Sequence, residues 1–191
     1  MADLSRIASL LRLRLVLGWM LLVMAASAWA QAPAAVLERQ VKAAYLFKFG
    51  AFVEWPDTSF VRPDSPLLIG VAGSDPLAEE LERMVAGRSV NGHPVKVRRV
   101  KPGEALADLH ILFLDSSLER GAMSAMLAGA RSHALLTVSD ASDASAQGCM
   151  INFLVAADKL RFDVALRHVA PSRLRISARM LAVAHKVQGA T

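Results

Sequence analysis

The residues that could support catalysis are scattered along the 191-residue chain. Ser116 and Ser117 follow an apolar run, a position that suits a hydrolase nucleophile at the end of a strand. The glycine-flanked elbow that exposes such a nucleophile is missing around them. We therefore interpret this segment as a loop that caps the next helix. A hydrolase that uses one of these serines with a histidine is the alternative from the enzyme class.

The remaining chemistry-bearing residues form no metal or nucleotide motif. The sequence has no H-E-x-x-H pattern and no Cys/His cluster, so a zinc site lacks its usual ligands. Residues 70–75 lack the complete glycine pattern of a nucleotide-binding loop, and Asp75 would repel a phosphate. We expect no catalytic residue, no metal and no cofactor, and hence no enzyme. The five histidines stand far apart in the sequence: His93, His110, His133, His168 and His185.

The single cysteine and the charge exclude further classes. Cys149 has no second cysteine to pair with, so an internal disulfide is impossible. We interpret it as a small buried apolar residue, with an intermolecular disulfide or a reactive thiol as the alternative. The formal net charge is +5 for the whole chain and +3 without its first thirty residues, and this mild excess does not suggest a nucleic-acid partner.

The first thirty residues have the three parts of a secretory signal. Basic residues lead, an apolar run follows over residues 15–26, and Ala28 and Ala30 provide the small-x-small cleavage pattern. The apolar run is shorter than the ~20 residues that span a bilayer, which disfavours an uncleaved membrane anchor. We expect a signal peptide over residues 1–30, cleaved after Ala30, a linker over 31–36, and one domain over 37–191.

The elements expected in this domain alternate between helix and strand. Apolar runs predict buried strands over residues 67–72, 109–114 and 134–138, and a mixed strand over 95–100 near an edge. Helices are expected over 37–52, 76–86 and 121–130. Alternating apolar residues predict a hairpin of 151–155 and 160–164, followed by a closing helix over 172–187. This order predicts a single-domain α/β sandwich, with a mostly parallel central sheet, helices on both faces and a C-terminal hairpin plus helix.

Two surfaces are candidates for binding a partner. The first helix and its exit are apolar on nearly all sides, so they are either buried or shared with another protein. Its candidate contact residues are Tyr45, Phe47, Phe49, Phe52 and Trp55. The second candidate is a basic region near the C-terminus that includes Arg175 and Arg179, one helical turn apart. An ordinary solvated face is the alternative for this region.

Several stretches resemble the YfiR-like periplasmic proteins. The opening, residues 41–49 followed by Phe52-Val53-Glu54-Trp55-Pro56, is the most specific of them. Residues 111–117, 135–140, 151–153, 159–164 and 174–182 resemble the later strands, hairpin and C-terminal signature of that family. The resemblance spans about residues 38–187, nearly the whole expected domain. Some relatives carry internal disulfides, which this chain cannot form.

The resemblance implies a regulatory role in the periplasm. YfiR-like proteins bind the periplasmic sensor region of a membrane-bound diguanylate cyclase and hold it inactive, which lowers cyclic-di-GMP and disfavours biofilm growth. An outer-membrane lipoprotein can sequester them, and a homodimer is plausible by the same resemblance. The alternative function is a periplasmic module that senses a small ligand for another membrane receptor, such as a sensor kinase.

Overall fold

The computed structural model describes residues 34–189 and divides the chain into two units, residues 1–38 and 39–191. The predicted signal peptide, residues 1–30, lies outside the described residues. In the first unit, residues 34–38 are described and are helical, so the last part of the predicted linker, 34–36, belongs to a helix. Within residues 34–189, no helix combines the length and hydropathy that crossing a membrane requires.

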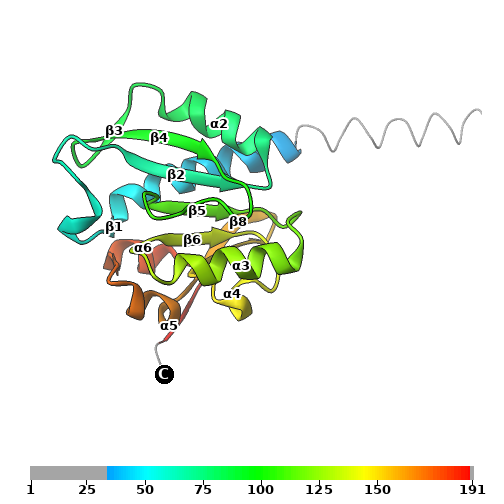
Figure 1. The fold of residues 1–191 in the computed structure, drawn as a ribbon. Helices are drawn as coiled ribbons and strands as arrows, with labels where there is room; N and C mark the ends of the chain where they lie inside the picture. The colour runs from blue at the N-terminus through cyan, green and yellow to red at the C-terminus, as the bar shows by residue number, and fades with distance from the viewer. Residues whose placement is uncertain (1–33, 190–191) are drawn as a thin grey trace, which may run out of the picture. The chain divides into compact units, whose positions relative to one another are not determined.

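The second unit is an α/β domain around one large sheet (Figure 1). In the described residues this sheet has eight strands, in the spatial order β10-β8-β7-β6-β5-β2-β4-β3. Their bounds are β2 Leu67–Ala72, β3 Ser89–Val90, β4 His93–Arg99, β5 Ile111–Leu114, β6 Leu136–Ser139, β7 Ile151–Ala156, β8 Lys159–Ala165 and β10 Lys186–Gln188. The pairs from β4 through β2, β5 and β6 to β7 are parallel, as is β8 with β10. The predicted mostly parallel sheet is confirmed.

Helices cover both faces of this sheet, which confirms the predicted sandwich. The helix of residues 39–52 and α2 (Asp75–Val85) contribute their buried side chains to one core cluster. The other cluster is built from α3 (Arg120–Ala130) and α4 (Ala144–Gln147). Figure 1 shows α3 in front of the sheet and the first helix behind it. Strands β2 and β5 are buried almost throughout, as strands of a sheet covered on both faces must be.

The predicted hairpin is confirmed in position and register. Strands β7 and β8 pair antiparallel, with Phe153 opposite Phe162. Their two-residue turn holds Ala157 and Asp158 at φ values of 49° and 56°, the backbone conformation that a tight hairpin turn requires. Phe49 of the first helix packs against Phe153 and Phe162. The ring centroids of Phe49 and Phe162 are 5.2 Å apart. The first helix therefore packs on the hairpin through aromatic contacts.

The predicted closing helix is confirmed only in part, because it occupies Ala178–Val183 and not the whole of residues 172–187. The segment begins at the end of a 3-10 turn (Ala170–Ser172) and continues with a short strand β9 (Arg175–Ile176), the six-residue helix α6 (Ala178–Val183) and the edge strand β10. Arg173 has a φ of 63°, which interrupts any helix. Tertiary pairing also overrides the local helical preference, because β9 pairs with β1 (Val53–Glu54) and the Ser177 amide donates to the Phe52 carbonyl at 2.9 Å. The C-terminal segment is thereby brought to the exit of the first helix.

Candidate protein-interaction surface

The aromatic residues predicted at the first helix divide between core and surface. Phe49 is 2% exposed and belongs to the core, so it is not available to a partner in this domain. Phe47 is half-buried, and the guanidinium of Arg88 lies 4.2 Å from its ring centroid. Tyr45 and Phe52 are also half-buried against the core. Trp55 is partly exposed and lines a cavity at the surface.

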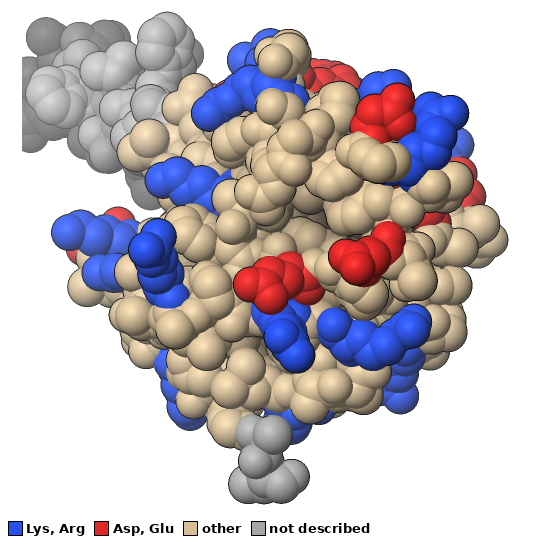
Figure 2. Space-filling model, turned by 90° about the vertical axis from the view of Figure 1, so that its left-hand side faces the viewer, with Lys and Arg blue, Asp and Glu red and all other residues tan. Residues whose placement is uncertain are grey.

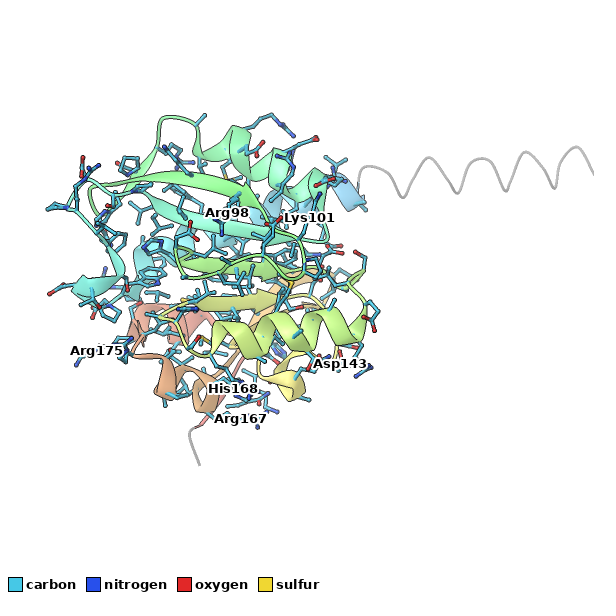
Figure 3. All side chains as sticks on the ribbon, viewed as in Figure 1. Arg98, Lys101, Asp143, Arg167, His168 and Arg175 are labelled. Atoms are coloured by element: carbon cyan, nitrogen blue, oxygen red, sulfur yellow. The ribbon has the colours of Figure 1, made fainter. Side chains whose placement is uncertain are left out.

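The two predicted surfaces meet at a small antiparallel ladder. Strands β1 and β9 place Glu54 opposite Arg175 and Val53 opposite Ile176. Arg175 and Arg179 are both exposed, and Arg175 lies at the periphery of the domain, well away from Arg167 and His168 (Figure 3). Figure 2 shows the face that carries β1, with acidic side chains across its middle and basic side chains beneath them. Residues separated by more than a hundred positions thus form one surface.

A cavity of about 240 Å³ opens beside Trp55, between β1 and the β3–β4 turn. We call it the helix-exit groove. Its apolar and aromatic lining residues are Val53, Trp55, Phe60, Leu67 and Val90, and Gly50 lines it as well. Its polar lining residues are Glu54, Asp57, Asn91 and His93. Sequence reasoning identified Trp55 but missed Phe60, Asn91 and His93, which reach the groove only through the fold.

Stacked rings hold the wall of this groove. Phe60 lies between His93 and His110, with centroid distances of 3.8 Å and 4.4 Å and interplanar angles of 11° and 22°. Trp55 donates its indole N–H to the His110 carbonyl at 3.3 Å and meets the His110 ring edge-on. The segment after the first helix, including the 3-10 turn Asp57–Ser59, is therefore tied to the sheet through side chains.

The hydrogen bonds of His110 define its protonation state. Its Nδ1 accepts the Leu68 amide N–H at 3.1 Å, so this nitrogen carries no proton. The proton then lies on Nε2, which donates to the Ser59 carbonyl at 3.1 Å. His110 is 4% exposed, and this burial lowers the pKa of its imidazole below the ordinary value of 6.5. The neutral ring is the form that fits.

Acidification should therefore destabilise the domain through His110. Its lowered pKa means that the unfolded chain binds a proton more readily than the folded one, so this contribution to stability is complete above pH 6.5 and is lost as the pH falls below it. We expect His110→Asn, whose side-chain oxygen can accept the Leu68 N–H, to reduce the fall in unfolding free energy between pH 7.5 and 5.5. The reduction is at most about 1.4 kcal/mol per pH unit. Urea unfolding at both pH values measures it, with His133→Asn as the matched control. An unchanged pH slope in His110→Asn would rule out this role.

The two candidate catalytic serines form hydrogen bonds within the loop, Ser117 through its hydroxyl and Ser116 through its backbone amide. Ser117 donates its hydroxyl to the Gly73 carbonyl at 3.1 Å, and the Ser116 amide donates to Asp140 Oδ1 at 2.7 Å. Within the described part of the chain, no histidine hydrogen-bonds to either serine, and His110 lies at the opposite end of β5. The geometry thus gives no support to the hydrolase alternative.

Asp140 also forms a part-buried ion pair that the sequence analysis missed. Its Oδ2 lies 2.6 Å from the Lys42 ammonium, and the two side chains are 11% and 13% exposed. This pair joins the first helix to the carboxyl end of β6. Lys42 and Asp140 both lie in stretches that resemble the family. Nothing else in the sequence indicated that the two residues form a pair.

The interpretation of Cys149 as a buried residue is confirmed. Its side chain is fully buried, its Sγ donates to the Ile151 carbonyl at 3.2 Å, and burial raises the pKa of the thiol to about 12. A thiol that is protonated and inaccessible is a poor nucleophile. Among residues 34–189, no group of three or more His, Cys, Asp or Glu side chains is placed to hold a metal ion.

A protein-family model described as YfiR/HmsC-like matches residues 39–185. This match covers nearly all of the second unit and confirms the resemblance found in the motifs. Proteins of this kind are periplasmic regulators connected in general with cyclic-di-GMP signalling. No curated protein matches the chain.

Proposed function

Because this chain belongs to the YfiR/HmsC-like family, we propose that it binds the periplasmic sensor region of an inner-membrane diguanylate cyclase and represses the enzyme. Cyclic-di-GMP is made on the cytoplasmic side, so the repressor acts through a conformational equilibrium of the sensor. A ligand shifts such an equilibrium only through differential affinity. The protein therefore binds the inactive sensor form more tightly than the active form.

The observation that carries this proposal is the helix-exit groove. It places the partly exposed Trp55, from the most specific stretch of the family resemblance, in a cavity at the surface. Tryptophan is enriched among the residues that dominate binding energy in protein interfaces. The exposed Arg175 lies on the same surface through the β1–β9 ladder. A surface with an aromatic anchor and charged neighbours suits recognition of a protein.

Deletion of the gene should raise cellular cyclic-di-GMP and increase biofilm formation. The physical reason is the loss of the tighter-binding partner that holds the sensor inactive. Cyclic-di-GMP measured by mass spectrometry in deletion and complemented strains tests this. A copy that lacks residues 1–30 is the matched control, because it should stay in the cytoplasm and fail to complement. Unchanged cyclic-di-GMP in the deletion strain would refute repression of a cyclase.

The alternative, a ligand-sensing module for another membrane receptor, is favoured by a second cavity. It has a volume of about 130 Å³ and is lined by Thr137, Met150, Arg131 and His168, among others. His168 lies next to Arg167, whose Nε is 3.1 Å from the His168 Nε2 (Figure 3). An apolar cavity with a few convergent polar groups is typical of small-molecule sites. A deletion phenotype that depends on a sensor kinase rather than a cyclase would support this alternative.

A further inference from the structure

We propose that the helix-exit groove receives an arginine side chain from the protein partner, stacked on Trp55 and paired with Glu54 and Asp57. This inference rests on the proposed function, since it names the chemistry by which the regulated partner is recognised. It is carried by the size, charge and ring arrangement of the groove.

The size of the groove accommodates a long side chain. Its volume of about 240 Å³ corresponds to roughly eight water molecules at ~30 Å³ each. A long side chain that enters from a partner's surface fills such a volume without burying the rest of a ligand.

The charge of the groove favours a cation. Glu54 and Asp57 are exposed at its mouth, and among the described residues neither forms an ion pair. No lysine or arginine of the described residues lines the groove, although basic residues outnumber acidic ones in the chain by 22 to 17. A net acidic cavity in a net basic protein is electrostatically complementary to a positively charged partner group.

A positive charge next to the helix-exit groove belongs to Arg175. It faces Glu54 in the β1–β9 register but makes no ion pair with it within the described residues. Its charge opposes a second cation, so it weakens the attraction of the groove without closing it. Removing this charge should therefore strengthen binding of a cation, whereas removing the carboxylates should weaken it. Opposite effects of these two changes on cation affinity indicate an electrostatic site, because the affinity of a purely apolar site would respond to neither.

The indole ring of Trp55 selects arginine among cations. A planar guanidinium stacks on an aromatic face and donates to carboxylates in parallel, which a compact ammonium group does less well. Trp55 is held in place by its hydrogen bond to the His110 carbonyl. Phe60, whose two faces are covered by the imidazole rings of His93 and His110, supports the wall beside it. Such pre-organisation reduces the entropy that binding must overcome.

An acetylated, amidated pentapeptide with arginine at its centre and glycine and serine around it is the probe, with citrulline as its neutral isostere. The indole N–H resonance of Trp55 in the exported protein, identified by Trp55→Phe, reports occupancy of the groove. We expect a saturable shift with the arginine peptide at concentrations on the order of millimolar. The citrulline peptide should bind at least about tenfold more weakly.

The variants test the roles of the charges. The double variant Glu54→Gln/Asp57→Asn should lose at least about tenfold in affinity, and Arg175→Gln should gain a few-fold. Equal binding of the two peptides, or no saturable shift, would overturn the proposal. Spermidine that binds as tightly as the arginine peptide would also overturn it, by assigning the groove to a free small cation. The two proposals can fail separately. If the peptide test fails but deletion of the gene raises cyclic-di-GMP, the arginine site is wrong, whereas the proposed repression of a cyclase is retained.

Discussion

Replacing Trp55 by alanine should reduce affinity for the regulated cyclase by about 30-fold or more, equivalent to about 2 kcal/mol. The indole forms the aromatic wall of the helix-exit groove, and its removal leaves a partner side chain without its stacking surface. Cyclic-di-GMP in cells that carry Trp55→Ala should approach the level of the deletion strain. Trp55→Phe, which keeps an aromatic ring, should retain an intermediate affinity.

Val61→Ala is the matched control for this prediction. Val61 lies on the same segment, is 95% exposed and does not line the groove. It should change neither the affinity nor the cyclic-di-GMP level. Folding must be checked by circular dichroism, because Trp55 also contacts His110. A folded Trp55→Ala protein that represses as well as the parent would exclude the groove as the binding site.

Replacing Asp140 by alanine should lower the free energy of unfolding by about 2–3 kcal/mol. The change removes one partner of the Lys42 ammonium, at 2.6 Å, and the acceptor of the Ser116 amide, at 2.7 Å. Because the Lys42 side chain is 13% exposed, water compensates poorly for the lost carboxylate. Urea unfolding followed by far-ultraviolet circular dichroism measures the loss.

The chain offers a matched control for this ion pair. Arg62 and Asp64 form an ion pair at 3.1 Å whose side chains are 74% and 75% exposed, so Asp64→Ala should cost at most about 1 kcal/mol. Asp140→Asn should lose less than Asp140→Ala, since its amide oxygen can still accept the Ser116 N–H. A loss in Asp140→Ala as small as that in Asp64→Ala would contradict the proposed anchoring of the first helix.

Elements with a strong local signal could be predicted from the sequence. Strands β2 and β5 appear as uninterrupted apolar runs, and β6 as a mainly apolar one with Thr137, because both of their faces are covered. The β7–β8 hairpin shows strict alternation around its turn, and the observed register pairs Ile151 with Val164 and Val155 with Leu160. In each case the pattern depends on neighbours within the same strand or hairpin.

Elements that depend on distant partners could not be predicted. Residues 172–187 contain enough apolar side chains for a helix, but Arg175 and Ile176 pair instead with a strand more than a hundred positions earlier. The same limit applies to the groove. Trp55 stands out in the sequence, whereas His93 reaches Phe60 only because the sheet places β4 beside β2. Lys42 and Asp140 are 98 positions apart, and no local pattern links them.

The central claim is that this protein represses a membrane cyclase by preferring the inactive form of its periplasmic sensor region. The most direct measurement is the affinity of the purified protein for that sensor region, in its inactive form and as an always-active mutant. We predict that the inactive form binds at least about tenfold more tightly. Equal affinity for the two forms would contradict the claim, because such a protein cannot shift the equilibrium between them.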